Sequence, residues 1–125
     1  MEAKKKLTVG DLIANSDKIK ARKNETKELY VKSLDATITV MKPSRATILD
    51  SHDLGNEEGN DFLVYECVVE PNLKDPALQE AYSVTGYGIL ESIFDLGEVD
   101  NIAKEIIVFA GYGADRVSVV ETTKN

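Results

Sequence analysis

The sequence predicts an α+β fold, in the form of a mainly helical single domain with a small N-terminal antiparallel β-hairpin. The chain has 125 residues, which is a usual length for one domain. Two segments near the N-terminus are rich in Val, Ile, Thr and Tyr and alternate apolar with polar residues, which is typical of strands. Most other apolar residues recur three and four positions apart, as in helices. Residues 1–125 are expected to form one domain, with loose tails at 1–7 and 114–125.

A first helix is expected over about residues 9–22, before the hairpin. Thr8 and Asp11 have the spacing of a capping box, and the apolar residues that follow fall on one helical stripe. The hairpin strands are expected over 28–33 and 37–41. Their connection lacks the Asp-Gly pair of a tight turn, so the sequence leaves the loop length and the register open.

The middle of the chain is expected to hold two helices joined by a loop. Ser44 has the position of a cap for a helix over about 45–54. The acidic, glycine-containing segment 54–61 predicts a mobile loop, and its spacing does not fit an EF-hand calcium site. Residues 62–70 fit a strand by their β-branched residues and a helix by the four-residue spacing of two glutamates. We predict a helix that crosses the core, with Cys67 as a small buried side chain.

The last third predicts three further helices. Asp75 followed by proline indicates the start of a short helix over about 76–82, and a second helical segment begins at Ile89 and closes at Leu96-Gly97. A final helix over about 98–110 has the strongest periodicity in the chain. Its apolar stripe is wider than one core face needs, which suggests burial on a second side by the chain or by a partner. The valines after this helix are expected to add an edge strand or to lie in a loose tail: Val117, Val119 and Val120.

The net charge of −7 conceals a division along the chain. Residues 1–45 contain 11 basic and 6 acidic residues, whereas residues 46–125 contain 4 basic and 16 acidic ones. The acidic part repels phosphate, so any nucleic-acid binding would have to use the basic first third of the chain. Four cations near the end of the first predicted helix suit the negative end of its dipole, or form a binding patch: Lys18, Lys20, Arg22 and Lys23.

No motif for catalysis, a cofactor or a metal emerges from the sequence. The one histidine, His52, lies between two aspartates near the acidic segment, where we expect a surface residue at a helix end and not a general base. The one cysteine excludes an intramolecular disulfide and a multi-cysteine zinc site. Neither glycine-tyrosine-glycine segment is a phosphate loop. With none of these motifs, the sequence predicts a protein that is not an enzyme and needs no cofactor. With no signal peptide and no long apolar run, it predicts a cytoplasmic protein.

Three stretches carry a resemblance to a known family: residues 29–45, 62–82 and 89–112. The middle stretch, which includes Tyr-Glu-Cys-Val-Val-Glu-Pro-Asn-Leu-Lys-Asp at 65–75, is the most specific. In this order they resemble the XkdN-like tail assembly chaperones of Bacillus-type prophages, without visible resemblance at 1–7 and 114–125.

The resemblance implies a small non-enzymatic protein that binds the tape-measure protein of a long phage tail. Such a chaperone keeps that helical protein soluble until tail tube subunits polymerise around it. The candidate partner-binding residues are apolar positions near the last two helices: Ile89, Phe94, Val108 and Phe109. Each of the four also fits a core position or a homodimer contact. The alternative is a small regulatory or nucleic-acid-associated protein that uses the four cations at 18–23.

Overall fold

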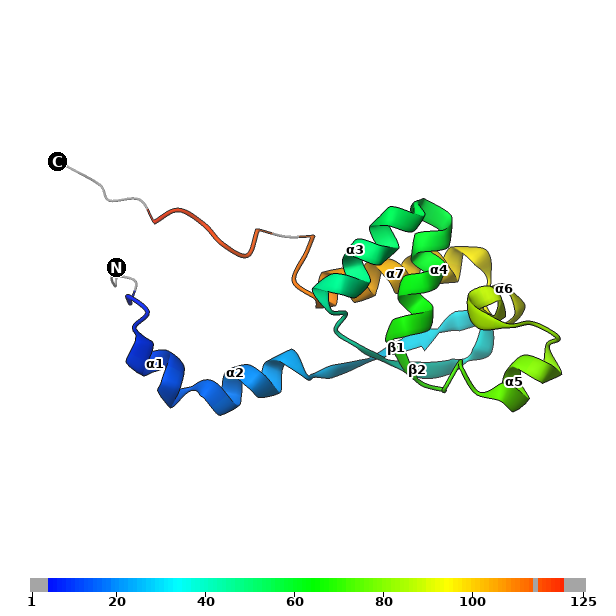
Figure 1. Cartoon of the computed structure of the whole chain (residues 1–125), viewed down its shortest axis with the longest axis horizontal. Helices are drawn as coiled ribbons and strands as arrows, with labels where there is room; N and C mark the ends of the chain where they lie inside the picture. Colours follow the sequence, from blue (N-terminus) through cyan, green and yellow to red (C-terminus); the bar gives the residue numbers. More distant parts are fainter. Residues whose placement is uncertain (1–4, 114, 121–125) are drawn as a thin grey trace.

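The computed structural model describes residues 5–113 and 115–120 of the chain (Figure 1). Within these ranges the fold is α+β, as predicted, with a three-stranded antiparallel sheet in the order β1-β2-β3. Helices cover one face of the sheet, and the core lies between the two layers (Figure 1). It contains Val31, Ile38, Val40 and Val68 from the strands and residues of α4, α6 and α7 from the helices. The sheet therefore has one strand more than the predicted hairpin.

The hairpin consists of β1 (Thr26–Val31) and β2 (Ala36–Met41), paired from Thr26 opposite Met41 to Val31 opposite Ala36. A 3₁₀ turn, η1 (Lys32–Leu34), joins the strands and ends at Asp35, whose φ of 47° is left-handed. This turn answers the question that the missing Asp-Gly pair left open, because an aspartate tolerates the left-handed conformation nearly as well as asparagine.

The third strand, β3 (Val68–Glu70), corrects the predicted helix over 62–70. The helix ends at Cys67, and the chain then pairs antiparallel with β2, with Val68 opposite Val40. Both readings of this segment are thus partly right. The two glutamates that suggested a helix lie on different elements, while the β-branched pair Val68-Val69 forms the strand.

The predicted loop over 54–61 is helical. Helix α3 (Arg45–Leu54) is capped by Ser44 as expected, and α4 (Asn56–Cys67) begins directly after Gly55, whose φ is 90°. Gly59, taken as a sign of a loop, is buried where α4 packs on α3. A Cβ there would lie 2.1 Å from the carbonyl oxygen of Ser51, and the Ser51 hydroxyl donates to the Gly59 carbonyl at 2.9 Å.

The remaining helices follow their local signals. Helix α5 (Pro76–Ala81) is capped by Asp75, whose carboxylate accepts from the Ala77 and Leu78 amides. A 3₁₀ turn, η2 (Gly86–Gly88), leads into α6 (Ile89–Ile93). Helix α7 (Leu96–Phe109) starts two residues earlier than predicted, because Asp95 and Glu98 form a capping box. Leu96-Gly97, predicted to close the preceding helix, therefore opens α7 instead. Ala110, the last residue of the predicted stripe, follows α7 and is half-buried. The other four residues of the stripe are buried in α7: Val99, Ile102, Ala103 and Ile106.

The predicted first helix is divided at Asn15 into α1 (Val9–Ala14) and α2 (Ser16–Lys23). Neither helix contains a buried residue, and together they extend away from the body as an arm (Figure 1). We use "the arm" for residues 5–24. Residues 5–7 and 115–120 have neither helix nor strand, so the edge strand does not form there. The rest of the predicted tails, 1–4, 114 and 121–125, lies outside the described residues.

Candidate partner-binding surface

Two of the four apolar candidates lie in the core. The exposed fraction is 0% for Ile89 and 4% for Phe94, so neither offers surface to a partner in this conformation. Their helical spacing marked an apolar face correctly, but that face packs against the protein's own interior. Ile89 and Phe94 therefore occupy core positions, the alternative that the sequence left open for them.

The other two candidates lie at the C-terminal end of α7. Val108 is 41% exposed, on the side of α7 opposite the buried stripe, and Phe109 is half-buried against the core. Two cations lie over the Phe109 ring, with the Nζ atoms of Lys27 and Lys42 at 5.7 and 5.1 Å from its centroid. Tyr112 follows and is also exposed. We call Val108, Phe109 and Tyr112 the α7-end surface.

Shallow hollows flank this end of α7. One of about 350 Å³ includes Lys42, Pro43 and Ala110, where the end of the arm meets the body. Another of about 230 Å³ includes Ile48, His52 and Ile107, between α3, α4 and α7. Each hollow includes a residue next in sequence to the α7-end surface, Ala110 in the first and Ile107 in the second.

A further hollow, of about 720 Å³, lies elsewhere, between the hairpin turn and the start of α7. Its polar centre is Glu98, which accepts hydrogen bonds from the Ser33 hydroxyl at 2.6 Å, the Ser33 amide at 2.9 Å and the Asp95 amide at 3.0 Å. The bonds from Ser33, and then the one from Asp95, lower the pKa of Glu98 below its ordinary value. The carboxylate is thereby used in joining α7 to the hairpin turn.

The four basic candidates lie on α2, within the arm. Lys18, Lys20, Arg22 and Lys23 make no ion pair with another residue of the described part of the chain. Lys42 donates to the carbonyl oxygen of Arg22 at 2.6 Å and so fixes the base of the arm to the body. The arm therefore carries its positive charge out to solvent.

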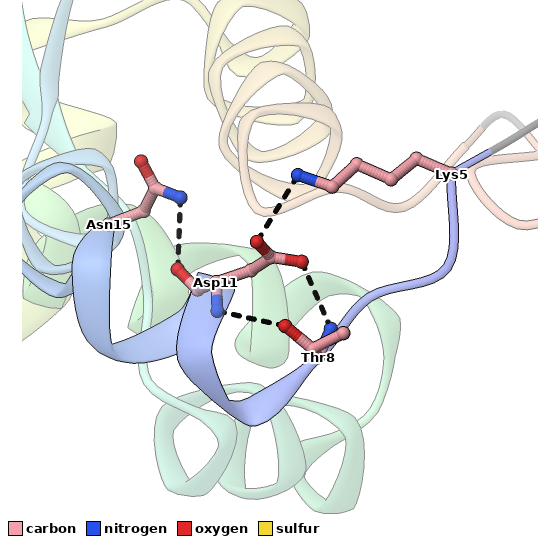
Figure 2. A network of polar contacts seen from close by, with 4 residues as sticks. All are labelled: Lys5, Thr8, Asp11 and Asn15. Carbon is pink, nitrogen blue, oxygen red and sulfur yellow. Dashed lines mark hydrogen bonds and ion pairs between the residues drawn. The ribbon is translucent and has the colours of Figure 1, made fainter.

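At the other end of the arm, a capping network holds the first turn of α1 (Figure 2). The Asp11 amide donates to the Thr8 hydroxyl, and the Asp11 carboxylate accepts from the Thr8 amide, both at 3.1 Å. Lys5 adds an ion pair with Asp11 at 3.2 Å. Lys5 first, and then Thr8, lower the pKa of Asp11. The predicted capping box is confirmed.

Acidic side chains gather where α4, α6 and α7 meet. Burial raises the pKa of Asp61, and the charges of neighbouring carboxylates add to this effect: Glu91, Asp100, Glu57 and Glu58. In the described ranges, the two ion pairs are Lys5 with Asp11 and Lys74 with Glu66. Most acidic residues in the described part of 46–125 thus face solvent without an ion pair.

The residues available for chemistry are few. Cys67 is buried, as predicted, and burial raises the pKa of its thiol to about 12, far from the reactive thiolate. His52 is exposed near the end of α3. Among the described residues, no group of three His, Cys, Asp or Glu side chains has an arrangement that holds a metal.

Sequence reasoning missed the exposed apolar residues of the arm. The exposed fraction is 73% for Val9, 45% for Leu12 and 70% for Ile13, although they form the stripe that predicted the first helix. A stripe of this kind ordinarily faces the core. The signal for a different role was its position beside four cations, within the basic third of an otherwise acidic chain.

None of the helices in the described part of the chain combines the length and the hydropathy that a bilayer span requires. No curated protein and no solved structure matches the sequence. The model of one family does match it, that of the phage XkdN-like tail assembly chaperone protein, over residues 4–124. This match extends past the three stretches that carried the resemblance, into segments at both ends where none was visible. The chain belongs to the XkdN-like family of phage tail assembly chaperones.

Proposed function

We propose that this chain is a non-enzymatic chaperone that binds the tape-measure protein and keeps it soluble until tail tube subunits polymerise around it. The proposal starts from the family, whose members are tail assembly chaperones. It places the protein in the cytoplasm of a bacterial host, with the tape-measure protein as the main partner and the tail tube protein as a second one. No cofactor or nucleic acid enters this role.

The α7-end surface is the observation that supports it best. Val108 and Tyr112 are 41% and 49% exposed, beside the half-buried Phe109 and two hollows. An apolar face of a long helical partner can lie across such a surface, in the manner of a helix bound in a groove. Ile89 and Phe94 are buried and would not touch the partner.

The charge of the body supports the second half of the proposal. Residues 46–125 carry 16 acidic and 4 basic side chains, a difference of −12. The acidic surfaces of two such complexes repel each other, which keeps apolar cargo dispersed. Binding supplies the apolar contact, and the acidic body supplies solubility.

Co-expression with the tape-measure protein encoded by the same phage tests the proposal. We expect the wild-type chain to increase the soluble fraction of that protein and to co-purify with it. Val108→Asp places a charge in the α7-end surface and is expected to abolish both effects. Leu96→Asp is the matched control, because Leu96 is exposed at the opposite end of the same helix. A tape-measure protein whose solubility is the same with and without the chain would refute the function.

The alternative is a nucleic-acid-associated role for Lys18, Lys20, Arg22 and Lys23. It rests on the absence of ion pairs to these four cations within the described ranges. Such binding would weaken steeply with salt. Fluorescence anisotropy with labelled DNA and RNA at low salt tests it, and no binding there would exclude this alternative.

A further inference from the structure

We propose that the arm of one copy docks on the acidic outer face of α3 and the start of α4 in a second copy. This face consists of Leu49, Asp50 and Asp53 on α3 and Glu57 on α4, and we call it the α3 face. The proposal concerns contacts between copies of the chain and does not rest on binding of the tape-measure protein.

The arm lacks the contacts that ordinarily stabilise a helix. Helices α1 and α2 have 6 and 8 residues, and neither buries a side chain. Isolated helices shorter than about 12–15 residues are marginal in water, because most helical stability in proteins comes from packing of one face. The capping box at Thr8 stabilises the first turn, but it buries no apolar area. The sequence therefore favours a helical arm whose packing surface is supplied from outside.

The arm presents an apolar stripe for that packing. Val9, Leu12 and Ile13 share one side of α1, and Leu7 precedes them with 72% of its surface exposed. Four exposed apolar side chains thus lie within seven consecutive residues, and a concentration of this kind marks an interaction site.

The second half of the arm is strongly basic. Four of the eight residues of α2 are Lys or Arg, against one aspartate, and the described part of the chain pairs none of the four cations. The partner for this arm therefore needs an apolar centre with carboxylates beside it.

The α3 face has this composition. Leu49 is 56% exposed, and Asp50 and Asp53 lie on the same side of α3. Glu57 extends the negative charge into α4, and Leu54 beside it is 40% exposed. None of these carboxylates has an ion pair within residues 5–113 or 115–120. Basic arm and acidic face are thus complementary in charge, and each carries exposed leucine.

The arm does not meet this face in its own chain. It extends away from the body (Figure 1). Its apolar stripe is exposed to solvent. The bond from Lys42 to the Arg22 carbonyl at 2.6 Å holds the base of α2 in that direction. A second copy satisfies both surfaces without rearranging the first.

Sedimentation velocity of the full-length chain over a range of concentrations tests the proposal. We expect self-association with a Kd tighter than about 1 mM, weakening as salt is raised. Lys18→Glu, Lys20→Glu and Lys23→Glu together are expected to weaken it by about tenfold, as are Asp50→Lys, Asp53→Lys and Glu57→Lys together. Mixing the two triple variants should restore association in a 1:1 heterocomplex, because the reversed charges are again complementary.

The matched control reverses three exposed acidic residues outside the α3 face, Glu70, Glu80 and Glu105, and should leave the wild-type Kd unchanged. Circular dichroism checks that each variant is folded. We expect all of them to fold, because substitutions at exposed positions ordinarily change stability little. A chain that stays monomeric up to about 1 mM would overturn the proposal. So would variants that associate as wild type, mixed variants that fail to associate, or an arm that associates only after tape-measure protein is added.

Discussion

Gly59 lies in a buried helix contact, although its sequence context predicts a loop. In sequence it stands among acidic and polar residues, a composition typical of loops. In the structure it is buried at the contact between α3 and α4, where only a hydrogen atom fits in the place of a side chain. The requirement for glycine there is steric, set by Ser51 on the neighbouring helix.

We expect Gly59→Ala to lower the free energy of unfolding by about 2 kcal/mol, because the added Cβ would meet backbone atoms that move only if the helices separate. A Cβ at this position would lie 2.1 Å from the Ser51 oxygen. Urea unfolding followed by circular dichroism measures the change.

Gly97→Ala is the control for this variant, since Gly97 lies on α7 with no atom within 4 Å of the added Cβ. Alanine is favoured over glycine in a helix by about 0.5–1 kcal/mol, so this variant should be as stable as wild type or slightly more stable. Equal losses in the two variants would contradict the packing argument.

At the scale of elements, Glu98 connects the hairpin turn to α7. Its carboxylate serves the capping box of α7 through Asp95 and also accepts two bonds from Ser33, 65 positions away in sequence. Both roles need the ionised form, and both lower the pKa of Glu98 from its ordinary value of 4.5. Because the folded state holds the proton less tightly than the unfolded state, this carboxylate adds stability above the unfolded pKa.

Glu98→Gln should therefore be less stable than wild type at pH 7. The difference should stay constant down to about pH 4.5 and shrink as the pH falls further, through the lowered pKa of the folded protein. Urea midpoints of both proteins between pH 7 and pH 3 measure it. The control is Glu105→Gln, because Glu105 is exposed on the same helix without a hydrogen-bond partner among the described residues. A stability difference between wild type and Glu98→Gln that does not change with pH would contradict this account.

At the scale of the whole molecule, the chain consists of an acidic two-layer body and a basic arm. The body buries its apolar residues between the sheet and the helices, whereas the arm exposes its own. Stability is therefore unequally distributed, since local opening is easiest where few apolar contacts are lost.

Hydrogen exchange should reveal this difference. In dilute protein, amides of α1 and α2 are expected to exchange much faster than those of α7, which buries four residues. If copies associate through the arm, its protection rises with protein concentration while that of α7 stays constant. Mass spectrometry of peptic fragments separates the two regions. Strong protection of the arm in dilute monomer would mean that it packs on its own body.

Local sequence was enough for features that nearest neighbours decide. Caps at Thr8, Ser44 and Asp75 and the buried stripe of α7 were predicted correctly, because a cap or a stripe depends on residues within one or two turns. The α+β class and the hairpin follow from similarly local patterns.

Features that depend on distant residues were decided by the tertiary structure. Val68 lies in a strand because it pairs with Val40 of β2. Gly59 lies in a helix that packs closely on Ser51 of α3. Of the candidate site, the sequence identified apolar residues but not their direction: Ile89 and Phe94 face the core, whereas Val108 faces solvent. Periodicity shows that a helix has an apolar face, but only the packing of the other elements determines whether that face is covered. For the arm, which nothing in the described chain covers, the same apolar pattern marks a surface for another molecule.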